Sequence, residues 1–442
     1  MNNSLAKTYT LPTLFLFALP NMLMMLIFSL YTIVDGTFVA KFVGTTALSA
    51  LNMVYPVICI EMAAAIMLAT GGNAVIARWM GEGRYEQARR VFTFLILMEL
   101  AAGVLIAVCG NLFVDQIVLA LGATPRQFAL SREYIRVFFA FAPCLFLQCA
   151  FQIFFVTAGK PAVGLAVTIL SGITNIVLDY VFLVPLATGI GGAALATGIG
   201  YSLTSAVGIV YFTCFRKKHL YFEKPKADRR FLLHACANGS SEMVTNLSNA
   251  VTTYLFNAAF LRFYGEDGVA AITIILYFQY VFTSLFFGYS NGIAPIVSFK
   301  FGEKNHAQLR RLFRSSLVIV TICSVAAVFL SQPALRRIVT IFAPEGSSVY
   351  NLTTEGFRIY VIAFLFMGFS IFASAWFTAL SNGKVSAAIS FARTFLFLAG
   401  ALVFLPLAIG SAGAWIAVPA AETAGILLAA ACLKKYRKIY RY

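Results

Sequence analysis

Residues 80–92, MGEGRYEQARRVF, decide the fold because the stretch returns as FGEKNHAQLRRLF at residues 301–313. The second copy begins 221 residues after the first (301 against 80), which is half of the 442-residue chain. The same offset, without gaps, relates residues far outside these two stretches. They are Gly44 and Gly265, Ala50 and Ala271, Gly71 and Gly292, Pro185 and Pro406, and Gly192 and Gly413. So many matches in one register predict that the chain is a duplicated unit.

The composition is that of a protein that lies in a lipid bilayer. Hydrophobic residues make up 60% of the chain and charged residues 11%, whereas about a quarter of the residues of a soluble domain are charged. Twelve apolar stretches exceed the roughly 20 residues that a membrane-spanning helix needs. They are 11–40, 46–77, 91–118, 134–158, 162–184, 192–215, 234–261, 269–299, 315–343, 357–380, 385–408 and 412–433. The first stretch, at about 30 residues, is too long for a signal peptide, so we expect it to be retained.

Twelve spans and one duplication predict an all-α polytopic membrane protein, with twelve transmembrane helices in two pseudo-symmetric six-helix lobes. We expect the first lobe at 1–215, a basic cytoplasmic linker at 216–232, and the second lobe at 233–442. Because each lobe has an even number of spans, the two lobes share one orientation. Their pseudo-twofold axis then runs along the membrane normal, as in transporters built from parallel repeats. This architecture favours two lobes that rock about a central cavity.

The net charge of +16 is distributed unevenly along the chain. Of the 33 Lys and Arg residues, 24 fall in segments on the same side as the amino terminus and 8 fall on the other side. This positive-inside bias predicts a multi-pass protein of the cytoplasmic (inner) membrane with both termini in the cytoplasm. The basic charge is therefore an orientation signal, and we expect no nucleic-acid partner.

Six of the 17 acidic residues fall well inside the predicted spans. They are Asp35, Glu61, Glu99, Asp179, Glu242 and Glu422. An acid inside a bilayer is costly unless it is paired, solvated or protonated, so each of them is a candidate functional residue. For Asp179, a hydrogen bond that merely packs two helices together is the alternative. Glu61 and Glu99 have no companion pattern on their spans, and their role stays open.

One of these acids has a polar companion in TNIVLDYVF, residues 174–182. Asn175 precedes Asp179 by one helical turn, so both lie on the same face. Small residues at steps of three and four along this span and the next predict a close helix contact. That contact would bring Asn175, Asp179 and Thr197 into one cluster of oxygen atoms, suited to a proton or a monovalent cation. For Thr197, plain packing is an equal alternative.

The first span contributes Asp35, fifteen residues after Pro20. A proline inside a helix removes a backbone hydrogen bond and permits a bend. Two carboxyl groups in one poorly solvated pocket cannot both ionise cheaply, so we expect Asp35 and Asp179 to share a proton or a cation. We expect the first span to repack, by bending near Pro20, when that ion binds.

Other site chemistries have no pattern in the sequence. The eight cysteines show no Cys-x-x-Cys spacing, and the three histidines have no ligand set around them, so we predict no disulfide framework and no metal site beyond a sodium ion at the acids. No pairing of a nucleophile with a base and no phosphate-binding loop supports an enzyme. The coupling ion is thus the only cofactor that we expect.

Several motifs together resemble the multidrug and toxic compound extrusion (MATE) family. Besides Pro20 with Asp35 and the span at 174–182, they are GGNAVIARWMGEGRYEQARR from Gly71, GIGGAALAT from Gly189, NGSSEMVTNLS from Asn238 and GSAGAWIAVPAAE from Gly410. The resemblance covers essentially the whole chain and is greatest to the branch of DNA-damage-inducible and staphylococcal-type drug exporters. It implies twelve helices in two lobes and efflux driven by a proton or sodium gradient. In the branch with a cation site in the first lobe, it implies a site at Asp35, Asn175, Asp179 and Thr197, with Gln152 as a further amide.

The second lobe departs from another branch of that family. That branch has acidic and tyrosine groups in spans seven and ten, but residues 357–380 contain no acid here. We therefore expect no cation site in the second lobe. Our hypothesis is that Glu242, Arg393 and Glu422 belong to the substrate cavity of that lobe. Glu242 and Arg393 would face the cavity or each other, with Glu422 near a bend at Pro419, and a purely structural ion pair is the alternative.

The expected function is that of a monomeric secondary antiporter that exports amphipathic, cationic small molecules in exchange for protons or sodium ions, with membrane lipids around it. A flippase of the same superfamily, which moves a lipid-linked or glycan precursor, is the alternative. Such flippases usually have extra spans and a markedly cationic cavity, whereas Arg393 is the one Lys or Arg that falls on neither side of the membrane in the charge tally. The major facilitator class is disfavoured because GEGRYEQARR does not fit its loop between spans two and three.

Overall fold

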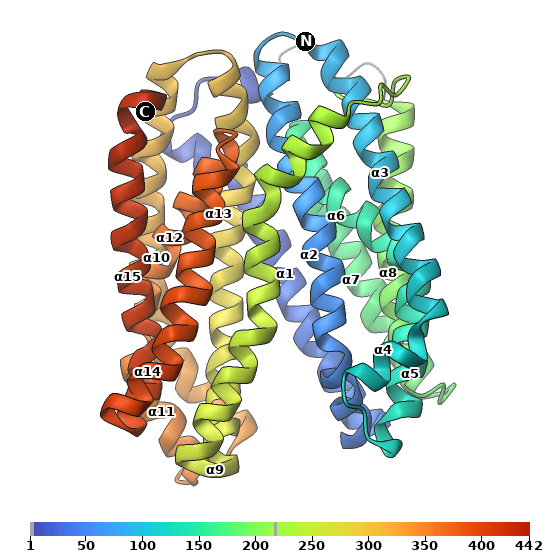
Figure 1. Ribbon diagram of the computed structural model, residues 1–442, viewed down its shortest axis with the longest axis vertical. Helices are drawn as coiled ribbons and strands as arrows, with labels where there is room; N and C mark the ends of the chain where they lie inside the picture. The colour runs from blue at the N-terminus through green and yellow to red at the C-terminus, as the bar shows by residue number, and fades with distance from the viewer. Residues whose placement is uncertain (1–3, 216–218) are drawn as a thin grey trace.

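A computed structural model describes residues 4–215 and 219–442, and all regular elements in these two ranges are helices (Figure 1). The first half contains α1 (Leu11–Phe38), α2 (Thr45–Gly81), α3 (Tyr85–Leu112), α4 (Val114–Ala120), α5 (Pro125–Ala140), α6 (Ala142–Thr157), α7 (Pro161–Leu183) and α8 (Ile190–Cys214). The second half contains α9 (Arg229–Gly302), α10 (His306–Phe342), α11 (Ser348–Tyr360), α12 (Ala363–Ala379), α13 (Gly383–Phe391), α14 (Gly400–Ile409) and α15 (Ser411–Tyr440). A short 3-10 helix, η1 (Ser4–Ala6), precedes α1, and the π-helical segments η2 (Val39–Val43) and η3 (Ala392–Ala399) follow α1 and α13.

The number of membrane spans follows from two bent pairs and one folded helix. In the described part of the chain, nine helices are long and apolar enough to cross a membrane, or eleven when the pairs α5–α6 and α11–α12 each count as one span. Helix α9 has 74 residues and a non-helical Gly265 with φ of 66°. Figure 1 shows that its two arms run in opposite directions, so α9 crosses twice. The prediction of twelve spans is confirmed.

The turn at Gly265 explains one glycine of the repeat. A positive φ is strained for residues with a Cβ atom, and glycine adopts it freely. Gly44, the repeat mate of Gly265, has φ of 114° at the equivalent turn, between η2 and α2. The duplicated glycines therefore mark the same reversal of the chain in each half.

Two spans that the sequence predicts as single helices are each broken. Between α5 and α6 the axis bends by 55°, and between α11 and α12 it bends by the same angle. Phe141, at the first break, has φ of −95° and ψ of 5°, and Pro143 follows within the first two positions of α6. A proline has no N–H to continue the preceding helix. The break therefore occurs where one helical hydrogen bond is lost.

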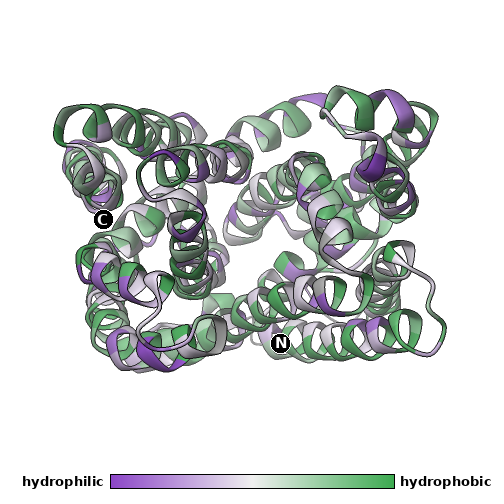
Figure 2. Cartoon of the chain, turned by 90° about the horizontal axis from the view of Figure 1, so that it is seen from below, coloured by the Kyte–Doolittle hydropathy of each residue, from purple (hydrophilic) through white to green (hydrophobic). Residues whose placement is uncertain are grey.

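The helices form two lobes, which Figure 2 shows from below as two groups. Both termini lie at the same end of the molecule, the upper end in Figure 1. The turns from α2 to α3 and from α9 to α10 lie at this end as well, whereas the reversal in α9 lies at the other end. The lobes contact each other mainly through α9, which packs against α1 and α2.

Each lobe contains an aromatic cluster around one member of a pair of repeat mates, Phe92 and Phe313. In the first lobe the ring of Phe92 lies 5.3 Å from that of Phe222. In the second lobe the ring of Phe313, the repeat mate of Phe92, lies 4.9 Å from that of Tyr442 and 5.3 Å from that of Trp376. The duplication thus extends from the sequence into the packing of the core.

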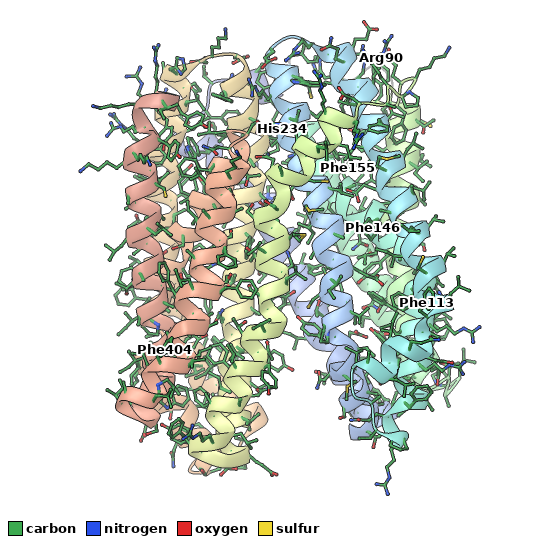
Figure 3. The ribbon with its side chains drawn as sticks, in the orientation of Figure 1. Arg90, Phe113, Phe146, Phe155, His234 and Phe404 are labelled. Atoms are coloured by element: carbon green, nitrogen blue, oxygen red, sulfur yellow. The ribbon has the colours of Figure 1, made fainter. Side chains whose placement is uncertain are left out.

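The phenylalanines outside these clusters serve two environments, as Figure 3 shows. Phe146 and Phe155 lie between the helices of the first lobe and are fully buried. Phe113 and Phe404 lie on the outside, with exposed fractions of 56% and 71%. Exposed rings of this kind suit contact with lipid chains, for which there is no penalty in a bilayer.

Candidate cation-binding site

Helices α1 and α7 carry the two carboxyl groups of the candidate site. Asp35 lies one turn before the end of α1, and Pro20 lies inside that helix, which is continuous from Leu11 to Phe38. Asp179 lies near the end of α7 and is fully buried. Helix α7 packs against both α1 and α8. Helix α7 therefore contacts both other helices of the candidate site.

The small and polar stripe of α7 brings it close to α8, as its spacing predicts. Ser171 Oγ donates a 2.7 Å hydrogen bond to the carbonyl oxygen of Gly200. A Cβ atom on Gly200 would lie 3.1 Å from that hydroxyl, tighter than ordinary contact. One turn further along, Asn175 Nδ2 donates to Thr197 Oγ1 at 3.3 Å. The predicted contact between Asn175 and Thr197 is thus present.

The carboxyl groups of Asp35 and Asp179 face each other. They lie close enough for a hydrogen bond between them when one of them carries a proton. Within the described residues no donor reaches Asp35 Oδ1, either oxygen of Asp179, or Asn175 Oδ1. Four buried oxygen atoms of the candidate site therefore have no hydrogen-bond donor in the described part of the chain. Because burying such acceptors unpaired is costly, the arrangement suits a proton or a hard cation bound among them.

Gln152, on α6, contacts α7 further along the same face. Its side-chain Nε2 donates to Thr168 Oγ1 at 3.3 Å, two helical turns before Asn175. The structure therefore brings Asp35, Asn175, Asp179 and Thr197 together and holds Gln152 at the edge of the group.

Three tyrosines around the carboxyl pair were missed by the sequence reasoning. Tyr31, Tyr134 and Tyr201 all lie within electrostatic range of Asp35. A hydroxyl of this kind can donate to a carboxylate and accept from a proton carrier. Tyr31 precedes Asp35 by four residues, the spacing of one helical turn, and this signal could have identified it.

Two further acids of the first lobe lie apart from this pair. Glu61, on α2, is 2% exposed, and Glu99, on α3, is fully buried. None of their four carboxyl oxygens has a hydrogen-bond partner in the described ranges. Their burial agrees with their predicted placement inside spans.

The second lobe holds an ion pair between Arg393 and Glu422. Arg393 Nε donates to both carboxylate oxygens at 3.0 Å, and its Nη2 donates to Oε1 at 2.7 Å. Glu242 lines a cavity of about 10 Å³ together with Arg393 and three serines, room for about one water molecule. Arg393 thus shares that cavity with Glu242 but pairs with Glu422. Glu422 follows Pro419, which lies inside α15, by three residues.

Twelve membrane-crossing helices in two equivalent lobes, with buried acids between the helices of each lobe, define a membrane transporter built from parallel repeats. The chain belongs to the MatE family, whose model matches residues 20–181 and again residues 242–403. The second match begins 222 residues after the first (242 against 20), close to the offset of the sequence repeat. The protein is therefore a MATE transporter and not an enzyme.

Relatives and solved structures agree with this assignment. The multidrug export protein MepA of Staphylococcus haemolyticus is 24% identical over 364 residues, which cover 80% of this chain and 79% of MepA. MepA of Staphylococcus aureus is 23% identical over 361 residues, with the same two coverages. The crystal structure of a MATE transporter in complex with MaL6 superimposes with a TM-score of 0.91 at 22% identity, over 98% of both chains. The outward-facing conformation of a multidrug resistance MATE transporter gives 0.91 at 21% identity, over 98% of this chain and 97% of that one.

Proposed function

We propose that this chain is a secondary antiporter that exports amphipathic, cationic small molecules across the cytoplasmic membrane in exchange for protons or sodium ions. The observation that carries the proposal is the carboxyl pair of Asp35, which is half-buried, and Asp179, which is fully buried; three of the four carboxyl oxygens are buried without a donor among the described residues. Asn175, Thr197 and Gln152 serve as neutral groups around the ion. The names of the MepA relatives, multidrug export proteins, support an exporter of small molecules. All five residues come from one chain, so a monomer suffices.

The proposed orientation has both termini in the cytoplasm. It is supported by the excess of Lys and Arg in the segments at the end of the molecule where the termini lie. The two lobes touch at that end, so the protein in this conformation opens toward the outside. An ion from outside then reaches Asp35 and Asp179 without crossing the closed end.

The proposed cycle begins when an ion binds between Asp35 and Asp179. Binding neutralises the pocket and removes the repulsion between the two carboxyl groups, so α1 repacks against α7, with Pro20 as the point that bends. Repacking narrows the cavity and releases the substrate outward, and the lobes then rock so that the ion leaves toward the cytoplasm. The gradient supplies about 1.4 kcal/mol per tenfold concentration ratio and about 2.3 kcal/mol per 100 mV.

The charges of the second lobe favour a cationic substrate. Arg393 and Glu422 neutralise each other through their ion pair, so Glu242 adds the unbalanced charge of that cavity. Once this cavity, which has room for about one water molecule, widens to admit a substrate, a negative charge at Glu242 beside Phe287 attracts an amphipathic cation through charge pairing, cation–π contact and burial of apolar surface. A carboxylate-bearing substrate would meet repulsion at the same place.

The experiment that tests the proposal is efflux of a cationic dye from vesicles with a proton or a sodium gradient imposed separately. We expect one of the two gradients to drive efflux and Asp179→Asn to abolish it while the protein stays folded in the membrane. Asp115→Asn is the matched control, because Asp115 is an exposed carboxylate of the same lobe, paired with Arg132. Wild-type efflux by Asp179→Asn would disprove the coupling role of this pair.

A further inference from the structure

The two lobes touch backbone to backbone at the end that holds the termini. A Cβ atom on Gly81 would lie 2.0 Å from the carbonyl oxygen of Phe299, and one on Gly302 would lie 2.1 Å from that of Arg78. These two contacts are repeat mates of each other, because 221 residues separate Gly81 from Gly302 and Arg78 from Phe299. The pseudo-twofold axis therefore passes through this contact, and the lobes cannot come closer here.

The chain segment before α1 lies across this junction. Ser4 Oγ donates to the carbonyl oxygen of Gly159, in the turn between α6 and α7 of the first lobe. Lys300 Nζ donates to the carbonyl oxygen of Ala6 at 2.7 Å, and Gln308 Nε2 donates to that of Tyr9 at 3.0 Å. Both of these donors belong to the second lobe. The segment Ser4–Tyr9 therefore ties the two lobes together.

The segment is compact and buried rather than loosely attached. Leu5 is fully buried and Tyr9 is 5% exposed. The Tyr9 hydroxyl donates to the carbonyl oxygen of Ser4 at 2.8 Å, which closes the segment on itself. Removing it from the junction would expose these side chains and break three hydrogen bonds to the two lobes.

Lys300 is the charged group on which the segment depends. Its side chain is 2% exposed, and its ammonium group is held by Ala6 and by Glu303, whose Oε2 lies 2.9 Å away. A buried ammonium is stable only while its hydrogen bonds are made or water replaces them. Glu303 lies three residues along the same chain, so this ion pair survives when the lobes separate. The bond to Ala6 does not.

Comparison of the two repeats shows that only the second lobe has a buried lysine at this position of the junction. The residue of the first lobe equivalent to Lys300 is Trp79. Its ring packs on that of Phe231, at the start of α9, with centroids 5.9 Å apart. The first lobe thus holds the start of α9 by an apolar contact, whereas the second lobe holds the segment before α1 by a charge that water can replace.

We propose that Ser4–Tyr9 is a latch, held by Lys300 and Gln308, that keeps the lobes together at the end where the termini lie. Release of the latch, with hydration of Lys300, lets this end open. The latch would serve the rocking of the two lobes in the proposed transport cycle. Its existence, however, requires only that the lobes separate at this end. The test therefore measures conformation and not transport, so that the two ideas can fail independently.

The test measures the distance between spin labels on Glu86 and Ala307, each replaced by Cys in a chain freed of its native cysteines. These two exposed positions are repeat mates at the starts of α3 and α10, one on each lobe. We expect Lys300→Met to raise the ratio of separated to closed lobes by about tenfold, the typical effect of losing one hydrogen bond to a charged group. Lys438→Met, at an exposed lysine of α15, should leave the ratio unchanged.

A second variant keeps the test valid if Lys300→Met does not fold. Gln308→Leu removes a neutral donor of the latch and leaves no buried charge, and it should shift the ratio in the same direction. Hydrogen exchange at residues 4–10 should become faster in whichever variant folds. Unchanged distances and unchanged exchange in a folded variant would overturn the latch, and Lys300 would then only fix the start of the chain.

Discussion

Arg393 and Glu422 form a forked ion pair inside the second lobe, with all three donor–acceptor distances at or below 3.0 Å. The side chains are 12% and 5% exposed, so the pair is shielded from water. Glu242, which lines the cavity beside Arg393, is left as the acid of this lobe that the arginine does not neutralise. Arg393 therefore pairs with Glu422, and Glu242 lies beside this ion pair without belonging to it.

The ion pair predicts a stability pattern that depends on which partner is removed. Glu422→Gln leaves the Arg393 charge buried without its counterion, and we expect the free energy of unfolding to fall by about 3–5 kcal/mol. The double variant Arg393→Met with Glu422→Leu removes both charges and should recover most of that loss. Thermal unfolding in detergent, followed by intrinsic fluorescence, measures both. As a control, the exposed pair of Arg132 and Asp115 should change stability by less than about 1 kcal/mol when it is broken.

Efflux by the double variant decides whether the pair has a role beyond structure. If Arg393 and Glu422 only stabilise the lobe, the folded double variant should transport at the wild-type rate. A folded double variant without transport would place the pair in the substrate pathway.

The glycine contacts between α2 and α9 predict a shift in conformation on adding a single methyl group. A Cβ atom on Gly71 would lie 1.9 Å from the carbonyl oxygen of Ala235, and one on Gly239 would lie 1.9 Å from that of Met67. Both neighbours are backbone atoms of the other lobe, which can yield only if the lobes move apart. We expect Gly71→Ala and Gly239→Ala each to favour the state in which the lobes are separated, as seen by the spin labels on residues 86 and 307.

Gly400 provides the matched control for these substitutions. It is helical, and a Cβ atom there would have no neighbour within 4 Å. Gly400→Ala should leave the lobe distance unchanged and raise the free energy of unfolding by up to about 1 kcal/mol, because alanine favours a helix. If Gly71→Ala behaved in the same way as Gly400→Ala, the contact between α2 and α9 would not control closure.

Features of the fold and of the candidate site could be predicted from the sequence where they repeat along the chain. Gly44 and Gly265 and the stretches at 80–92 and 301–313 occur in register, so the duplication and the twelve spans could be predicted. The stripe on α7 follows helical spacing, so the contact of Asn175 with Thr197 could be predicted as well.

Features that depend on the rotation of one helix against another could not be predicted. Glu242 lies on α9 and Glu422 on α15, and only the packing of those helices against η3 decides which acid Arg393 binds. The 55° bend between α5 and α6 was missed because a straight span and a bent span have the same pattern of apolar residues. Tyr134 and Tyr201 were missed because their approach to Asp35 is a property of the assembled lobe.

Thr197 should distinguish sodium coupling from proton coupling. Its hydroxyl, which accepts from Asn175, offers an oxygen ligand to a sodium ion, whereas a proton needs only the carboxyl groups. Thr197→Val keeps the shape of the side chain. We expect it to reduce efflux if sodium is the ion that drives transport, and to leave efflux unchanged if the proton is. The control is Thr213→Val, at an exposed threonine near the end of α8. Loss of efflux in this variant when a proton gradient drives transport would mean that Thr197 supports the packing of α7 on α8 and not the ion.

Asp35 and Asp179 should act as one unit in any measurement of coupling. In the proposed function one ion is shared by both carboxyl groups, so removing either group would destroy the site, and the effects of the two substitutions would not add. We expect Asp35→Asn, Asp179→Asn and the double variant to lose gradient-driven efflux to the same low level. Binding of a cationic dye to the purified variants should persist, but it should no longer depend on pH or on sodium. If the two groups bound separate ions, the losses would multiply, and the double variant would transport less than either single variant. That outcome would disprove a single shared site between α1 and α7.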